Sequence, residues 1–261
     1  MVLERLISVK LAVEKPIVVF YLGVVISCVS ILISYFVFHH SIGMFSVFMI
    51  TVGAAPFIYN LSKFAEAKEE ELVKNLRGNF LARHRSIIFV FIWFFTGVAF
   101  TFLIAYLFVP NHLVEVIFQD QTSTITQIRG SAVSPSTLQK ILINNLGVLA
   151  LSFVFSLIYG TGAVFILAWN ASVLGTVIGM TTRSFGDIRA LPIAVLTYFP
   201  HGSLEMLAYF LGGIAGCVAS AALTRREIKY VPYVLMDSMK MILASVLLLV
   251  LAAVIETGLL I

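Results

Sequence analysis

Apolar and polar positions divide the chain into hydrophobic stretches that are each about as long as a membrane is thick. A bilayer core of about 30 Å needs roughly 20 apolar residues in a helix, because each residue adds about 1.5 Å. Polar or charged residues separate the stretches. We therefore predict an all-α polytopic membrane protein, a bundle of six to seven transmembrane helices, with spans at 16–38, 42–61, 87–109, 141–158, 163–180, 191–223 and 239–261.

Two short segments are expected to interrupt helices in the second half of the chain. Tyr159-Gly160-Thr161-Gly162 separates the fourth span from the fifth, and the sixth apolar run contains Pro200-His201-Gly202. Proline removes a backbone donor, and glycine weakens a helix interior. We therefore predict helix breaks at Gly160, Gly162, Pro200 and Gly202.

Three polar or amphipathic segments lie outside the predicted spans. Residues 1–15 alternate charged and apolar side chains at helical spacing, which predicts an amphipathic helix on the membrane surface. The charged stretch 63–85 is predicted to extend the second span as a surface helix. Residues 111–137 form the long polar connection of the chain and are expected to be a loop on the outer side.

The composition indicates a membrane protein. Hydrophobic residues make up 60% and charged residues 11%, whereas soluble domains contain roughly 45–50% and about 25%. The net charge of +4 does not indicate nucleic-acid binding, because cytoplasmic loops of membrane proteins are rich in Lys and Arg. Most basic residues fall on the side of the N-terminus when the spans alternate, so we predict a multi-pass protein of the cell membrane with its N-terminus inside.

The spans divide into two regions at the polar connection. Residues 1–137 would form an N-terminal membrane region with three spans, and residues 138–261 a C-terminal region with four. The polar residues that call for an explanation lie in the second region.

Ionisable and amide side chains at membrane depth are costly, so each needs a reason. Asn170 lies midway along the fifth span, where its amide is expected to bond a neighbouring helix. His201 and Glu205 are four residues apart, so they share a helix face and can pair. Glu205 should point inward, towards His201, Asn170 or water, whereas Glu256 is expected to reach the interface. A structural polar clasp, a transport or proton-handling site, and catalysis are the three alternatives.

Motifs for catalysis are missing from the sequence. A zinc protease would need His-Glu-x-x-His, and an α/β-hydrolase a Gly-x-Ser-x-Gly elbow; the chain contains neither. His201 and Glu205 supply two ligands where a catalytic zinc site needs three. We therefore expect no enzyme activity, no metal and no cofactor.

Small residues recur at four-residue spacing in two spans. Gly175 and Gly179 do so in the fifth span, and Gly212 and Gly216 in the sixth. Such faces allow helix backbones to approach closely. We expect them to pack the fifth span on the sixth, with the seam of a homodimer as the alternative.

These residues together resemble the stage II sporulation protein M family. The resemblance rests on Asn144-Asn145-Leu146, the Gly-rich turn 159–162, Asn170 before a glycine-containing helix, and above all Pro200-His201-Gly202 with Glu205. It covers about residues 141–223.

The resemblance implies a role in a membrane complex. The family's namesake is an integral membrane protein that anchors or localises sporulation proteins D and P, which degrade peptidoglycan. By this resemblance we expect a non-enzymatic scaffold or complex subunit with the lipid bilayer and other proteins as partners, in which Asn170, His201 and Glu205 are important. A transporter or channel subunit, with a polar His201/Glu205 site in broken helices, is the alternative.

Overall fold

Over the residues that the structure describes, the chain consists of helices joined by short turns, with no strand. This computed structural model describes residues 8–74, 80–131, 137–159, 162–224 and 231–260. Seven of its helices are long and apolar enough to cross a membrane. They are α2 (Ile17–Val37), α3 (Ile42–Lys74), α4 (Phe80–Phe108), α7 (Thr137–Tyr159), α8 (Ala163–Ser184), α9 (Leu191–Thr224) and α10 (Val231–Leu260). The predicted all-α polytopic membrane protein is confirmed.

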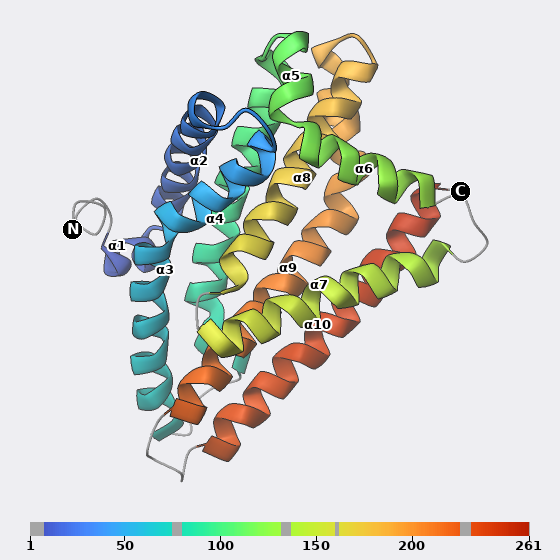
Figure 1. Ribbon diagram of the computed structural model, residues 1–261. Coiled ribbons are helices and arrows are strands. Elements are labelled where there is room, and N and C mark those ends of the chain that lie inside the picture. Colours follow the sequence, from blue (N-terminus) through green and yellow to red (C-terminus); the bar gives the residue numbers. More distant parts are fainter. Residues whose placement is uncertain (1–7, 75–79, 132–136, 160–161, 225–230, 261) are drawn as a thin grey trace.

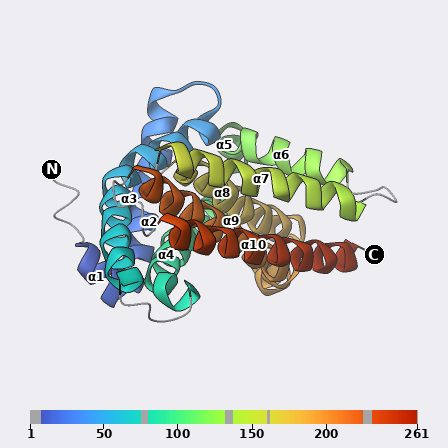
Figure 2. The ribbon, with the colours of Figure 1, turned by 90° about the horizontal axis from the view of Figure 1, so that it is seen from below.

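The long helices form two groups that meet at α8 and α9. Helices α2, α3 and α4 stand together on the side of the N-terminus, while α7 and α10 run obliquely side by side towards the C-terminus (Figure 1; seen from below in Figure 2). Helix α8 packs mainly on α4, and α9 packs on both α7 and α10. The middle helices therefore connect the first half of the chain to the second.

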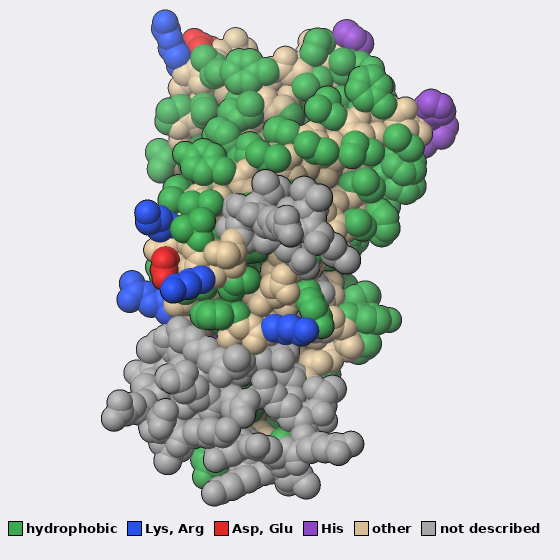
Figure 3. All heavy atoms as spheres, turned by 90° about the vertical axis from the view of Figure 1, so that its left-hand side faces the viewer, with side chains coloured by type: hydrophobic (Ala, Val, Ile, Leu, Met, Phe, Trp, Pro, Cys, Tyr) green, Lys and Arg blue, Asp and Glu red, His purple; other side chains and the backbone are tan. Residues whose placement is uncertain are grey.

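The outer face of the first group is apolar. Along α2, Tyr21, Val25 and Val29 are exposed at four-residue spacing, whereas Leu22 and Ile26 on the opposite face are buried. Hydrophobic side chains cover the upper part of this side of the molecule, with Lys and Arg side chains gathered below them (Figure 3). An apolar band that ends in basic residues is the surface expected of a membrane-embedded bundle.

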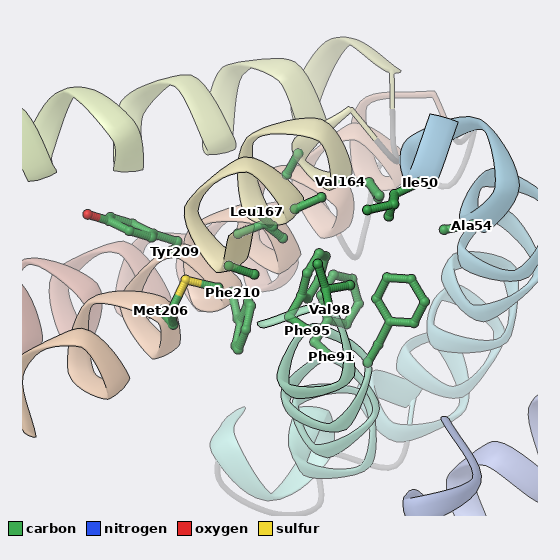
Figure 4. Close-up of a cluster of buried hydrophobic side chains, with 14 of the residues drawn as sticks. Ile50, Ala54, Phe91, Phe95, Val98, Val164, Leu167, Met206, Tyr209 and Phe210 are labelled. Atoms are coloured by element: carbon green, nitrogen blue, oxygen red, sulfur yellow. The ribbon is translucent and has the colours of Figure 1, made fainter. Parts of the chain in front are cut away.

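Aromatic rings from α4 and α9 fill the centre of the core. Phe95 stacks on Phe210 with ring centroids 5.3 Å apart, and Phe91 lies 6.1 Å from the same ring. Val164 and Leu167 of α8 lie beside this cluster (Figure 4). Because these residues come from three different helices, the contact holds α4, α8 and α9 together by dispersion.

Helix α9 is continuous through Pro200 and Gly202, so the predicted break at these two residues is wrong. A proline inside a helix removes one backbone donor, and transmembrane helices tolerate this because neighbouring groups compensate locally. Gly202 serves packing instead, since a Cβ placed there would lie 2.9 Å from Leu174 of α8. By contrast, α7 ends at Tyr159 and α8 begins directly after Gly162, which confirms a helix break at Gly162. Gly160 lies outside the described residues.

The polar connection after α4 is helical, not the expected loop. Helices α5 (Asn111–Ile117) and α6 (Gln119–Ser131) occupy most of it. The side chain of Gln121 is fully buried and donates from Nε2 to Ser172 Oγ in α8, at 3.3 Å. Asp120 Oδ2 accepts from the Met44 backbone N–H at 2.9 Å. This polar segment is therefore fixed to the bundle by its side chains.

The remaining boundaries differ from the expected ones in smaller ways. Helix α3 continues past its span to Lys74, in agreement with the predicted surface extension, and the rest of 63–85 is divided by residues outside the described ranges. Of the predicted surface helix at 1–15, the described part contains α1 (Val9–Glu14). Helix α10 begins at Val231, inside the expected loop. Its Asp237 accepts a hydrogen bond from Lys240 at 3.2 Å, which compensates the charge within the helix.

The two glycine faces have different partners, so the expected packing of the fifth span on the sixth through these glycines is wrong. A Cβ on Gly175 would meet the Ala99 carbonyl of α4, and one on Gly216 would meet the Phe153 carbonyl of α7. Gly179 lies against Tyr106 of α4, and Gly212 against Leu149 of α7. Both faces are occupied within the chain, which removes them as the seam of a homodimer.

Candidate functional site

Glu205 forms a hydrogen bond between two membrane-spanning helices. Its carboxylate, half-buried on α9, accepts from Asn145 Nδ2 of α7 with Nδ2 and Oε1 2.5 Å apart. Asn144 Nδ2 donates in turn to Asn145 Oδ1 at 3.2 Å. Asn145 is 6% exposed. The carboxylate thus points into the bundle, as expected, but its partner is an amide that the sequence analysis used only for the family resemblance.

His201 does not pair with Glu205. Both residues are described, and no ion pair within 4.0 Å joins them. The imidazole is 8% exposed, and its buried Nδ1 has no hydrogen-bond partner. Its ring meets the Tyr198 ring edge-on, with centroids 6.0 Å apart. Helical spacing allowed the pair, but the packing of α9 places the imidazole beside Tyr198 instead.

Asn170 bonds its own helix. Its Nδ2 donates to the Ile166 carbonyl one turn earlier, at 2.8 Å. The expected bond to a neighbouring helix is therefore wrong. A transmembrane amide can be satisfied without an interhelical partner when its donor returns to the backbone of the preceding turn. Asn170 therefore takes no part in the hydrogen bond at Glu205.

Two further polar side chains lie near Glu205. Tyr209 follows it by one turn on α9 and is 2% exposed, and Glu256 of α10 is half-buried. The charges of Glu205 and Glu256 act on each other, and both act on the Tyr209 hydroxyl. Figure 4 shows this hydroxyl directed away from the apolar cluster. The site is therefore a polar cluster of Asn145, Glu205, Tyr209 and Glu256, contributed by α7, α9 and α10.

The cluster contains members that the sequence reasoning missed. Asn145 enters the sequence analysis only through the family resemblance, Tyr209 is not singled out there, and Glu256 is expected only to reach the interface. A signal for Tyr209 was present, because it continues the four-residue spacing of His201 and Glu205. The contribution of α7 and α10 depends on helix packing, which no local pattern encodes.

The cluster offers oxygen ligands rather than a transition-metal site. Across the described residues, no group of three or more His, Cys, Asp or Glu side chains is arranged to hold a metal ion. Two carboxylates, an amide and a phenol can bind protons, accept hydrogen bonds or contact hard cations.

Comparison with known proteins gives one result. The sequence model of the family described as stage II sporulation protein M matches residues 88–259. The match extends beyond the 141–223 of the resemblance on both sides, and includes nearly all of the membrane-spanning part of α4 and of α10. No curated protein and no solved structure matches the chain. Because the family match covers most of the chain, this multi-pass membrane protein belongs to the stage II sporulation protein M family.

Proposed function

We propose that the chain is a non-enzymatic scaffold that organises partner proteins at the cell membrane. The observation that carries the proposal is the hydrogen bond between Glu205 and Asn145. It uses the carboxylate that follows Pro200-His201-Gly202 to join α7 to α9. The carboxylate thereby acts as a clasp between helices.

The continuity of α9 favours the scaffold over transport. Discontinuous helices at membrane depth commonly line substrate paths, and the expected break at 199–202 was one of two reasons for the transporter alternative. With α9 unbroken, that reason disappears. The other reason, the break before α8, lies at the end of a span, between Tyr159 and Ala163.

Exposed surfaces for partners lie on α7, α10 and α5. Helices α7 and α10 are the least buried spans, with 22% and 33% of their most apolar windows covered by the rest of the chain. Glu115 and Val116 of α5 are exposed beyond the spans. A scaffold needs such faces in addition to a rigid centre, because it binds without chemistry of its own.

Purification from the native host, with a tag on the full chain, tests the proposal. We expect a partner protein in fixed stoichiometry under mild detergent, for the wild type and for Glu205→Gln alike. The glutamine keeps an oxygen that accepts from Asn145 and removes only the ionisable group. The chain recovered alone would contradict the proposal.

Reconstitution of the purified chain into liposomes is a second test of the scaffold proposal. A scaffold produces no flux of protons, ions or small solutes above empty liposomes. A flux that the wild type supports and Glu205→Gln abolishes would replace the scaffold with a transporter, because the substitution preserves the helix contact but not the titratable carboxyl.

A further inference from the structure

Basic side chains mark one end of each of the first three spans. Lys15 lies just before the span of α2, Lys63 just after the span of α3, and Arg85 at the start of the span of α4. Because consecutive spans run in opposite directions (Figure 1), these three ends lie at the same edge of the bundle. Helix α1, which carries Lys10, packs on α2, α3 and α4 and therefore lies across that edge. We call Lys10, Lys15, Lys63 and Arg85 the basic edge.

Helix α1 is anchored to the bundle by one face and exposes the other. Ala12 is fully buried in the core, whereas Lys10, Leu11 and Lys15 are exposed. A surface helix that exposes both apolar and basic side chains is suited to the boundary between lipid headgroups and acyl chains. We therefore place Lys10 and Lys15 at the height of the headgroups.

Two members of the basic edge lie over aromatic rings. The Lys63 ammonium is 4.5 Å from the centroid of the Tyr59 ring, and the Arg85 guanidinium is 5.5 Å from that of the Phe89 ring. Each ring lies one turn deeper in its span and faces outward, with Tyr59 53% and Phe89 40% exposed. Exposed aromatic residues favour the membrane–water interface, and long basic side chains reach from there to the headgroups. These pairs place the two charges at the depth of lipid phosphates, independently of α1.

Three of the four cations are not neutralised by the protein. In the parts of the chain that the structure describes, no carboxylate forms an ion pair with Lys10, Lys15 or Arg85. The carboxylate of Glu14 is one turn from Lys10 on α1 and is itself exposed. Uncompensated cations at a membrane edge attract anionic lipids, whose phosphates lie at this depth.

We infer that the basic edge binds the headgroups of anionic phospholipids. Lys10, Lys15 and Arg85 donate to the phosphate oxygens, and the exposed rings of Tyr59 and Phe89 contact the acyl chains beneath. The bound lipid fixes α1 to the membrane and to the first three spans. This inference does not rest on the scaffold proposal, because it requires no partner protein.

Quenching of tryptophan fluorescence by brominated lipids tests the site in the full chain, reconstituted into liposomes. The chain contains two tryptophans, and Trp169→Phe leaves Trp93 as the single reporter. Trp93 is half-buried on α4, beyond Arg85, and its ring centroid is 6.3 Å from that of Phe20 in the first turn of α2. It therefore reports on acyl chains beside the basic edge.

The measurement compares brominated phosphatidylglycerol with brominated phosphatidylcholine at the same low ionic strength. Each basic residue near an acidic lipid surface strengthens binding roughly fivefold. We therefore expect the anionic lipid to reach half-maximal quenching at a mole fraction at least about fivefold lower than the zwitterionic lipid. Because salt screens exposed charges, the difference should shrink as the salt concentration rises.

Variants made in the single-tryptophan chain locate the effect. Lys15→Gln/Arg85→Gln should remove most of the preference for phosphatidylglycerol. The control Lys140→Gln/Arg189→Gln removes the same charge from exposed positions at the start of α7 and just before α9, and it should retain the preference. Arg85→Lys keeps the charge and should also retain it, which separates the charge of this residue from its shape.

Three results would overturn the proposal. Equal quenching by the two brominated lipids at low salt would show that the basic edge has no preference for anionic headgroups. A preference that persists in Lys15→Gln/Arg85→Gln would place the headgroups elsewhere. Equal loss in the two double variants would show attraction to the net charge of the chain instead of a site. None of these results bears on partner binding, which is measured by purification from the native host.

Discussion

Asp120 caps a helix that is distant in the chain: its Oδ2 accepts from the backbone N–H of Met44, 76 residues earlier, at 2.9 Å. Met44 is the third residue of α3, where a helix has no backbone acceptor for its N–H. Local capping residues usually satisfy such donors. Here the cap comes from α6 and joins two distant parts of the chain.

Loss of this cap should destabilise the fold. We expect Asp120→Ala to lower the free energy of unfolding by about 1 kcal/mol, as for other helix caps. Thermal unfolding in detergent measures the change. Asp120→Asn retains a side-chain oxygen and serves as the matched control; an equal loss in both variants would show that charge, rather than capping, is responsible.

The packing of α7 on α9 should depend on Gly216. Gly216→Val places a side chain against the Phe153 carbonyl and the Ser156 side chain, and overpacking of this kind costs roughly 1–3 kcal/mol. Gly147→Val is the control, since nothing lies within 4 Å of a Cβ at that position. Size-exclusion profiles after heating should show aggregation at a lower temperature for Gly216→Val only.

Loss of the Asn145 amide, which bonds another helix, should destabilise the fold more than loss of the Asn170 amide, which bonds its own helix. Asn145→Leu leaves a carboxylate of α9 without its donor, so we expect a loss of about 1–3 kcal/mol. Asn170→Leu removes only a bond to the Ile166 carbonyl of its own helix and should change stability much less. Chemical unfolding of both variants in the same detergent compares them; equal losses would contradict the clasp.

The orientation of the chain is open to direct measurement. With the N-terminus inside, single cysteines at His40 and Asp187, in a background lacking Cys28 and Cys217, should react with a membrane-impermeant thiol reagent on intact cells. A cysteine at Lys15 should react only after the membrane is permeabilised. The reverse pattern would show that the basic residues do not set the topology as the positive-inside rule predicts.

The sequence allowed the spans to be predicted well and their contacts poorly. The length of an apolar stretch reflects the thickness of the bilayer core. Hydropathy therefore predicted the first span at 16–38, where the structure has α2 at Ile17–Val37. Polarity misled at 111–131, because the buried Gln121 there finds its partner only in the tertiary fold. Spacing of four residues identified Gly175 and Gly216 as packing residues, but the choice of helix on which each packs is made by the whole bundle.

The candidate site shows the same limit. Glu205 was identified from its cost at membrane depth, and its inward direction followed from physics. Its partner Asn145 is 60 residues away in the chain, and no local pattern links the two. His201, four residues away on the same helix, was the expected partner of Glu205, but its ring contacts that of Tyr198 instead.

The contact of Gly175 and Gly179 with α4 sets a lower limit on any autonomous fragment. A truncated chain that started at 138 would retain the pairing of α7 with α9, but it would expose the glycine groove of α8 to acyl chains that fit it poorly. A fragment that keeps both backbone contacts must include α4. The family match begins at residue 88, inside that helix, so the matched region includes most of α4 together with the helices that follow it.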